Sequence, residues 1–301
     1  MFRWFMKLTF LGTSCMVPTK KRNHQALFIE HNEEGLLVDC GEGTQRQLKI
    51  AEIKPSKISK IFISHWHGDH VFGLPGLLQT LNANEYYKRL EIYGPKGTKN
   101  RIKQLFSVFS LNLGFSIKII ELTKDTKIEF KEIVVYSKKL KHSMPCLGYA
   151  FIEKDRRRIN KKYIKKLAVP DGPLLGKLQN NEIINWNNKT ITPEEATYVV
   201  KGKKISVVLD TLPCKNAEEL AEESDLLIAE AVYDSSLQKK AEENKHMTAK
   251  QAAMLALKSK VKKLIITHFS QRYKSPELLL KEAKTIFKNT TAAKDLMSIL
   301  V

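Results

Sequence analysis

The densest group of side chains with metal-binding chemistry lies in one stretch of the chain, Ser64-His65-Trp66-His67-Gly68-Asp69-His70. It directly follows a short apolar segment that is typical of a buried strand. Alternate side chains of an extended chain point to the same side, so we expect His65 and His67 to reach one ion. Beyond a sharp turn at Gly68, we expect Asp69 and His70 to reach a second ion nearby. A polar loop with fortuitous histidines is the alternative, but three of the eight histidines fall in this run.

Two ions need more ligands than this run provides. His142, Asp210 and His268 each follow an apolar segment of strand-like composition. An isolated acid or imidazole at a strand end is more often a surface group or a satisfied core residue. Three such residues in a chain that already carries the histidine run favour metal binding instead. Imidazole and carboxylate ligands without a thiolate are typical of zinc, with Mn²⁺ or another divalent ion as an alternative.

Short apolar segments and amphipathic segments alternate along most of the chain and must position these ligands. Strands are predicted at 7–11, 26–30, 36–38, 60–64 and 90–93, with further β segments up to 152, and again at 204–209, 226–229 and 262–266. Helices are predicted at 75–84, 99–110 and 216–223, within 235–258, and from 275 onwards. An α/β sandwich of two sheets with outer helices fits this order, and other α/β layouts stay open.

The segment 153–201 interrupts this alternation and reads as an inserted arm. Its first part carries one acid, Asp155, and eight basic residues: Lys154, Arg156, Arg157, Arg158, Lys161, Lys162, Lys165 and Lys166. Turn-forming residues follow, among them Gly172 and Pro173, and then an Asn-rich stretch at 180–188. Such a cluster can neutralise several phosphates of a nucleic acid. A solvated linker whose charges only aid solubility is the alternative.

The composition narrows the class of protein. A chain of 301 residues can form one large domain or two modest ones, and its formal charge of +19 favours polyanionic partners. The charge alone would also fit a merely basic, soluble protein. The four cysteines are scattered, which argues against a disulfide framework and favours a reducing compartment. The apolar run at 1–6 is too short for a signal peptide, and no segment offers about 18 uninterrupted apolar residues, so we expect no membrane span and a cytoplasmic location.

The histidine run, together with His142, Asp210 and His268, resembles the signature of the metallo-β-lactamase superfamily. Within it the chain resembles the ribonuclease Z family over nearly its whole length. The segments that carry this closer resemblance are 10–14, 18–23, 39–48, 142–149, the Gly172-Pro173 arm, 246–248 and 268–273. The resemblance implies a metallo-β-lactamase fold, a four-layer αββα sandwich forming a single domain over 1–301. The basic arm at 153–201 would project from that domain as a contact site for RNA.

The resemblance also implies which residues hold metal. His65, His67 and His142 would bind one zinc ion, Asp69, His70 and His268 a second, and Asp210 would bridge them. Two departures from the family pattern are visible. Leu209 precedes Asp210 where the family often has Gly, and Ala229-Glu230-Ala231-Val232 stands where it often has His-Glu-Ala-Thr. The acid, Glu230, is kept.

The activity that the resemblance implies is removal of the 3′ trailer from precursor tRNA by a zinc-dependent endoribonuclease. Two ions would activate a water that attacks the phosphorus, leaving a tRNA 3′-hydroxyl and a trailer 5′-phosphate. Asp69 would accept the proton of that water, and His246, oriented by Glu230, would protonate the departing oxygen. The alternative for His246 is a surface histidine at the start of a helix capped by Thr248.

Substrate contacts and assembly also follow from the resemblance. The residues expected to contact RNA are Lys20, Lys21, Arg22, Lys161, Lys162, Gly172, Pro173, Ser270 and Arg272. A homodimer is expected, in which the arm can serve the partner's active site. Three other hypotheses remain: a small-molecule hydrolase of the same fold, a flavodiiron-type oxygen reductase, and a zinc-stabilised RNA-binding protein without activity. A small-molecule hydrolase does not need a basic arm. A flavodiiron-type reductase has an acid at the position where this chain has His67. A zinc-stabilised RNA-binding protein needs a metal whose coordination is closed by protein ligands, whereas seven ligands for two ions leave room for water and substrate.

Overall fold

The computed structural model describes residues 6–301, which divide into two compact units. The first contains residues up to Ile128, Val135–Phe151 and Lys204–Val301, and the second contains Glu129–Val134 and Ile152–Lys203. All seven expected metal ligands lie in the first unit. Of the apolar run at 1–6 that we discounted as a signal peptide, only Met6 is among the described residues. No helix among residues 6–301 is long and apolar enough to cross a membrane.

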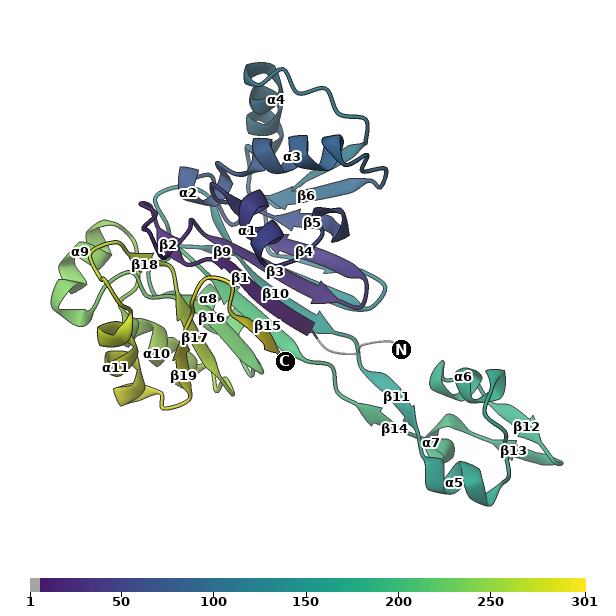
Figure 1. The fold of residues 1–301 in the computed structure, drawn as a ribbon. Coiled ribbons are helices and arrows are strands. Elements are labelled where there is room, and N and C mark those ends of the chain that lie inside the picture. Colours follow the sequence, from purple (N-terminus) through teal and green to yellow (C-terminus); the bar gives the residue numbers. More distant parts are fainter. Residues whose placement is uncertain (1–5) are drawn as a thin grey trace. The chain divides into compact units, whose positions relative to one another are not determined.

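The first unit contains two sheets of seven strands (Figure 1). In the first sheet the strand order is β20-β1-β3-β4-β5-β6-β7. Its strands are β1 (Met6–Gly12), β3 (Ala26–His31), β4 (Glu34–Val38), β5 (Ile58–Phe62), β6 (Leu90–Gly94), β7 (Ile117–Glu121) and β20 (Ser298–Leu300). Pairing is antiparallel from β20 to β4 and parallel from β4 to β7. The carboxyl ends of β4 and β5 therefore lie at the same edge of the sheet.

The second sheet has the order β19-β17-β16-β15-β10-β9-β8. Its strands are β8 (Thr126–Glu129), β9 (Ile133–Leu140), β10 (Cys146–Glu153), β15 (Lys204–Val208), β16 (Leu226–Glu230), β17 (Leu264–Thr267) and β19 (Thr290–Ala292). The strands β15, β16, β17 and β19 are parallel, so the segments after β15, β16 and β17 leave the sheet at one edge. Asp210, Glu230 and His268 belong to these three strand ends.

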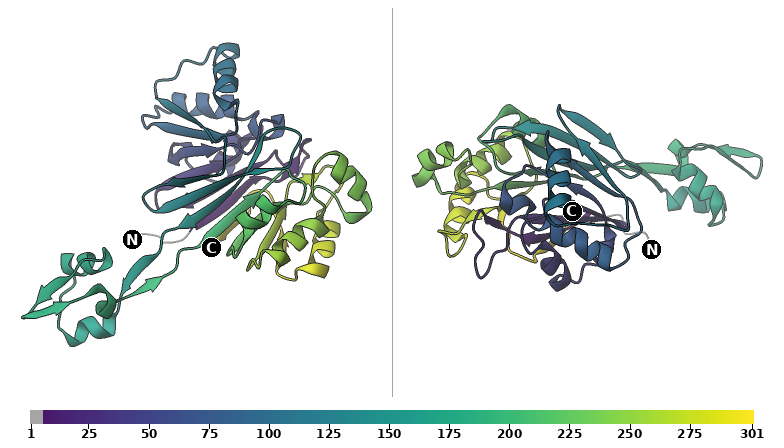
Figure 2. Two further views of the ribbon diagram at one scale, coloured as in Figure 1. Left: turned by 180° about the vertical axis from the view of Figure 1, so that it is seen from behind. Right: turned by 90° about the horizontal axis from the view of Figure 1, so that it is seen from above.

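Helices cover the outer face of each sheet. On the first sheet, α1 (Thr44–Ile50), α3 (Leu74–Ala83) and α4 (Thr98–Val108) bury side chains such as Leu48, Leu77 and Ile102 against strand residues. On the second sheet, α8 (Lys215–Ala221), α10 (Ala249–Lys258) and α11 (Glu277–Ile286) do the same with small residues including Ala253. The two helical layers appear in blue and in yellow-green (Figures 1 and 2).

Aromatic rings pack between the two sheets. The ring of Phe62 on β5 lies 5.3 Å from that of Tyr149 and 5.2 Å from that of Phe151, both on β10. All three side chains are fully buried. Two sheets in contact with helices outside them form four layers, so the predicted αββα sandwich is confirmed. The burial of apolar surface on both faces explains why so many of the strands are nearly continuous runs of Leu, Ile, Val and Phe.

Most predicted elements are present with boundaries shifted by one or two residues. The structure adds two strands near the C-terminus that the sequence analysis missed, β19 and β20. Each is only three residues long, and β20 pairs with β1 while β19 pairs with β17. It also adds the two-residue pair β2 (Ser14–Cys15) and β18 (Phe269–Ser270). The shorter helices are α2 (Gly68–Val71) and α9 (Gln238–Glu243), and Pro55–Lys57 and Ser235–Leu237 form single 3₁₀ turns.

The second unit is folded and has an apolar core of its own. The strand β11 (Arg156–Ile159) pairs with β14 (Thr197–Val200), and β12 (Ile184–Trp186) pairs with β13 (Lys189–Ile191). Three helices accompany them: α5 (Lys161–Lys166), α6 (Pro173–Gln179) and α7 (Pro193–Ala196). Its buried core residues are Ile164, Val169, Leu178, Ile184, Ile191 and Ala196. A solvated linker would bury none of these, so the segment is not a linker; RNA contact by its basic residues stays a prediction.

Candidate active site

The histidine run forms the connection between β5 and α2. After Phe62, the Ile63 N–H donates to the Tyr93 carbonyl at 2.8 Å, which keeps the chain extended past the end of the strand. Helix α2 then begins at Gly68. Its φ is not positive, so left-handed backbone is not the reason for glycine here. A Cβ at this position would lie 2.1 Å from the ring of Phe72, an exposed side chain that would have to move aside to admit it.

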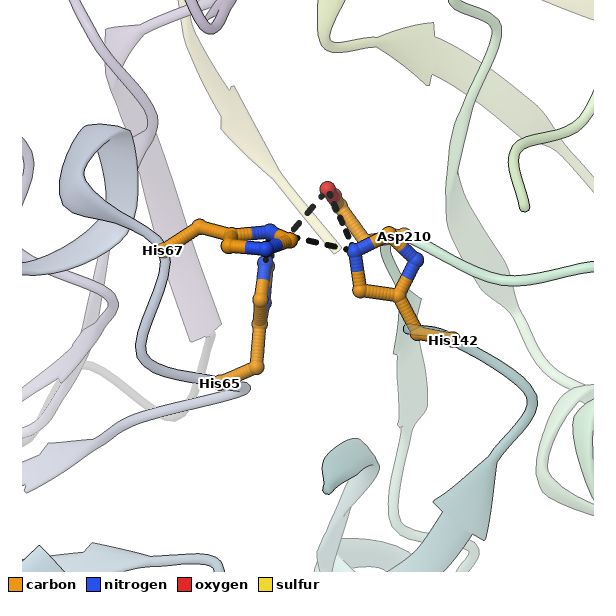
Figure 3. Close-up of side chains that lie close together, drawn as sticks. All are labelled: His65, His67, His142 and Asp210. Carbon is orange, nitrogen blue, oxygen red and sulfur yellow. Dashed lines mark hydrogen bonds and ion pairs between the residues drawn. The ribbon is translucent and has the colours of Figure 1, made fainter. Parts of the chain in front are cut away.

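Three imidazoles, those of His65, His67 and His142, and the carboxylate of Asp210 converge beside the connection between β5 and α2 (Figure 3). His65 Nε2 lies 2.9 Å from His67 Nδ1, which in turn lies 3.1 Å from His142 Nε2. Asp210 Oδ2 lies 3.6 Å from His65 Nε2 and 4.0 Å from His142 Nε2. The facing atoms of these four residues all lie within 4.8 Å of one another, a spacing that suits a single metal ion.

A second group of donors shares Asp210 with the first. His70 Nε2 lies 3.1 Å from His268 Nε2 and 3.5 Å from Asp210 Oδ1. Asp69 Oδ2 lies 3.5 Å from His70 Nε2 and 3.4 Å from His268 Nε2. The two oxygens of Asp210 therefore face different groups, Oδ2 the first and Oδ1 the second. This is the arrangement expected of a carboxylate that bridges two ions.

Three acidic or imidazole residues that follow strand ends have left-handed backbone, which helps to orient their side chains. Asp39 after β4, Asp210 after β15 and His268 after β17 have φ values of 59°, 44° and 60°. Left-handed backbone costs a non-glycine residue about 1–2 kcal/mol. Such residues persist where surrounding contacts fix them, and they are frequent at functional sites. Leu209, the departure from the family's glycine, is fully buried and leaves this turn intact.

The histidine nitrogens that point away from the two groups are held by other atoms. His65 Nδ1 lies 3.0 Å from Ser64 Oγ, and His142 Nδ1 lies 3.1 Å from the Lys245 carbonyl oxygen. A carbonyl can only accept, so His142 Nδ1 carries the proton and its Nε2 keeps a free lone pair. Such hydrogen bonds fix the tautomer and orientation that a metal ligand requires.

Asp39 is the carboxylate that holds His70, and the sequence analysis did not assign it. His70 Nδ1 donates to Asp39 Oδ2 at 2.7 Å, and the Ser64 N–H and hydroxyl donate to Asp39 Oδ1 and Oδ2 at 2.7 and 2.8 Å. The Asp39 side chain is fully buried. Its position directly after a predicted strand, like that of Asp210, was the signal that could have identified it.

The donor set fits divalent cations. Asp69 Oδ1, Asp210 Oδ1 and His268 Nδ1 are buried and make no hydrogen bond within the described part of the chain. Burial, the largest effect, and the neighbouring His70 lower the pKa of His65, so its imidazole is neutral. Burial opposes ionisation of Asp210, but His268 and His70 hold the pKa of that carboxyl well below its usual range. Burial lowers the pKa of His70, but Asp210, Asp69 and Asp39 outweigh this and raise it, so a cation bound there would displace the His70 proton. Ionised carboxylates and neutral imidazoles are the forms that bind metal.

His246 and Glu230 lie beside the two donor groups. His246 Nδ1 is 2.9 Å from Glu230 Oε2, while Glu230 Oε1 accepts the Thr211 N–H at 2.6 Å. Burial lowers the pKa of His246, but the Glu230 carboxylate outweighs this and raises it to about 9. His246 is buried rather than exposed at a helix start, so the surface alternative is wrong.

The expected RNA contacts differ in their surroundings. Lys20, Lys21 and Arg272 are exposed, and Arg272 Nε donates to Ser270 Oγ at 3.1 Å. Arg22 is instead buried, and its Nη2 donates to the carbonyl oxygens of Tyr273 (2.7 Å) and Ser270 (3.2 Å). Its guanidinium braces the segment that carries Arg272. In the second unit the expected contacts are all exposed: Lys161, Lys162, Gly172 and Pro173.

Comparisons with known proteins agree with this geometry. The family model of the anti-Pycsar protein Apyc1 matches residues 6–151. A ribonuclease Z from Archaeoglobus fulgidus is 40% identical over 98% of this chain and 97% of its own length. The crystal structure of human tRNase Z, short form, is 29% identical and has a TM-score of 0.72. The match covers 98% of each chain. The crystal structure of the metallo-β-lactamase fold protein YhfI from Bacillus subtilis is 18% identical and has a TM-score of 0.73. The match covers 99% of this chain and 100% of YhfI.

Two sheets between helical layers, with a histidine and aspartate cluster at their strand ends, define a protein of the metallo-β-lactamase fold that can bind metal. Within that class the full-length identity of 40% is decisive. The chain belongs to the ribonuclease Z family.

Replacing Asp39 by Asn tests how far the cluster depends on the carboxylate behind it. Asn tolerates the left-handed backbone of this position, but it has only one acceptor oxygen, so its NH2 group would face either the Nδ1 proton of His70 or the N–H of Ser64. We expect metal affinity to fall about 10–100-fold with the fold retained, measured by equilibrium dialysis against a competing chelator. The matched control is Asp125→Asn at an exposed surface ion pair. Unchanged affinity in the Asp39 variant would show that His70 needs no such support.

Proposed function

We propose that this protein is a zinc-dependent endoribonuclease that removes the 3′ trailer from precursor tRNA. The observation that carries the proposal is the 40% identity with a ribonuclease Z over 98% of this chain, a range that includes the expected metal ligands and the basic second unit. The crystal-structure neighbour named tRNase Z supports the same substrate. The converging histidines and aspartates support hydrolysis, because they can hold the divalent ions that such a reaction uses.

We assign two zinc ions to the cluster. The first would be held by His65, His67 and His142, and the second by Asp69, His70 and His268, with Asp210 between them. The separate orientation of the two Asp210 oxygens supports this division. When bound, such ions polarise a phosphoryl oxygen and lower the pKa of a water, which is the chemistry that phosphodiester hydrolysis needs.

The chain's own residues would handle the protons. Asp69 would accept the proton of the attacking water, because one of its oxygens makes no hydrogen bond while the other accepts the Met16 N–H at 2.7 Å. As the P–O3′ bond breaks, the departing 3′ oxygen requires a proton, and His246 would supply it. Glu230 would hold the Nδ1 side of His246, which leaves Nε2 as the nitrogen that faces the substrate. The products are a tRNA 3′-hydroxyl and a trailer 5′-phosphate.

Cleavage of a precursor tRNA with mapped ends is the experiment that tests the function. We expect the zinc-loaded protein to cut at the 3′ side of the tRNA, a chelator to abolish cutting, and added zinc to restore it. Asp69→Ala should abolish cleavage while tRNA binding stays largely intact, with exposed Asp125→Ala as the control. A wild-type protein that leaves the precursor uncut would refute the function, and normal turnover by Asp69→Ala would refute the site assignment.

His246→Ala separates proton transfer from metal binding. Loss of a general acid lowers turnover by about 10²–10⁴-fold, and we expect kcat to fall in that range with metal content unchanged. Single-turnover cleavage and elemental analysis measure the two quantities on one sample. His31→Ala on β3, a histidine outside the cluster, is the matched control. If bound metal fell together with turnover, His246 would be a ligand instead, as its proximity to His268 also allows.

We assign the grip on the tRNA body to the second unit. Its helix α5 exposes Lys161, Lys162, Lys165 and Lys166 on a folded scaffold, and Asn160 caps the helix by accepting the Tyr163 N–H at 3.3 Å. Gly172 has φ 154°, and no other residue comes within 4 Å of where its Cβ would be, so the backbone before α6 is open to a partner. Exposed cations on ordered backbone bind phosphates without the ordering cost of a flexible tail.

The double variant Lys161→Ala, Lys162→Ala tests this grip through its salt dependence. Each lost phosphate contact lowers the slope of log affinity against log salt by about one. We therefore expect the slope for precursor tRNA to fall by roughly two, measured by filter binding at several salt concentrations. Lys281→Ala, Lys284→Ala on α11 removes the same charge elsewhere and serves as the control. An equal change in both double variants would indicate an effect of net charge and not a local grip.

We further assign a homodimer in the cytoplasm. The side chains of Phe72, Val108 and Phe109 are 67%, 73% and 49% exposed and line an apolar groove of about 390 Å³. Apolar surface of this kind supports association with a protein. Sedimentation that shows only a monomer at all concentrations would contradict the dimer.

The described cysteines are all free, which supports a reducing compartment such as the cytoplasm. Cell fractionation tests that location.

A further inference from the structure

Cys15 lies at the edge of the metal cluster although no sequence motif pointed to it. Its sulfur, a carboxylate oxygen of Asp69 and a nitrogen of His268 all lie within 4.8 Å of one another. The three side chains are 8%, 3% and 0% exposed. Both neighbours belong to the second donor group, and Asp69 Oδ1 makes no hydrogen bond within the described chain.

Two backbone contacts hold Cys15 between these neighbours. Strand β2 pairs in parallel with β18, which begins directly after His268, so Ser14 lies opposite Phe269 and Cys15 opposite Ser270. On the other side, the N–H of the next residue, Met16, donates to Asp69 Oδ2 at 2.7 Å. The backbone at Cys15 is therefore held by strand pairing and by the contact to Asp69.

Sulfur changes the ligand chemistry of this position. Imidazole and carboxylate donors accept zinc and manganese alike, whereas a thiolate selects softer ions. A buried cysteine that only fills space behaves as a small apolar residue, and Cys15 does belong to a buried apolar cluster with Val232 and Tyr233. Proximity to two ligands, one of them with an unpaired buried oxygen, distinguishes it from such a residue.

We propose that Cys15 supplies a sulfur ligand to the metal position formed by Asp69 and His268, so that this position takes thiophilic ions such as Zn²⁺ and Cd²⁺ in preference to Mn²⁺. On binding, the S–H bond breaks, a sulfur–metal bond forms, and the proton leaves to the buffer. No oxidation state changes. The inference rests on the two-metal assignment under the proposed function.

Cadmium titration of the full-length, metal-free protein tests the proposal without reference to activity. A thiolate bound to Cd²⁺ gives an ultraviolet charge-transfer band that nitrogen and oxygen ligands do not give. We expect this band to grow with added Cd²⁺ in the wild-type protein and in Cys214→Ser, whose half-buried sulfur lies in none of the donor groups. We expect it to be lost in Cys15→Ser and in Cys15→Ala, with Cd²⁺-over-Mn²⁺ selectivity reduced in both.

The outcomes separate this inference from the function on which it rests. If wild-type protein binds two Cd²⁺ ions by elemental analysis without the band, Cys15 is not a ligand and the two-metal site stands. If the protein binds no Cd²⁺ at all, both assignments are overturned. A band that persists in folded Cys15→Ala assigns the sulfur to another cysteine and also overturns the proposal. The wild-type spectrum decides the question even if a Cys15 variant fails to fold.

Discussion

The structure depends on the convergence of buried imidazole lone pairs and ionised carboxylates at one point. His65, His67 and His142 turn ring nitrogens toward one another at about hydrogen-bond distance, and Asp69 and Asp210 add negative charge beside them. Lone pairs and anions packed in this way repel one another in a medium of low dielectric constant wherever no proton lies between them. A divalent cation between them reverses the sign of that interaction. The sheet packing, the hydrogen bonds behind the imidazole rings and the backbone conformation at the strand ends hold the donors in this otherwise unfavourable arrangement.

Rigidity of the two sheets is what makes the convergence possible. The ligands come from strand ends far apart in the chain, and a sandwich core with rings such as Phe62, Tyr149 and Phe151 fixes the sheets face to face. The loops then need little freedom of their own. Asp39 and the Lys245 carbonyl oxygen fix the rings from behind, and left-handed backbone at Asp210 and His268 turns the side chains inward.

The sequence predicted the parts of this centre that local patterns encode. The histidine run is dense, and His142, Asp210 and His268 follow recognisable strands, so residue type and position sufficed to select them. Pairing between distant segments is not local. The contact of Cys15 with the cluster arises from two-residue strands, β2 and β18, that are too short to show any period. For the same reason β19 and β20 were missed, since three residues give no alternation to detect.

The wall behind Cys15 connects one departure from the family pattern with the chemistry of the centre. Val232 stands where the family often has threonine, and it packs in one buried cluster with Cys15 and Tyr233. Valine brings no hydroxyl, so it offers the thiol no hydrogen bond, and burial raises the pKa of Cys15 well above its usual value. An apolar wall keeps the sulfur protonated and inert toward solvent until a cation displaces the proton. Glu230, two residues before Val232, is hydrogen-bonded to His246. The apolar surroundings of Cys15 and the carboxylate that holds His246 therefore come from one short stretch at the end of β16.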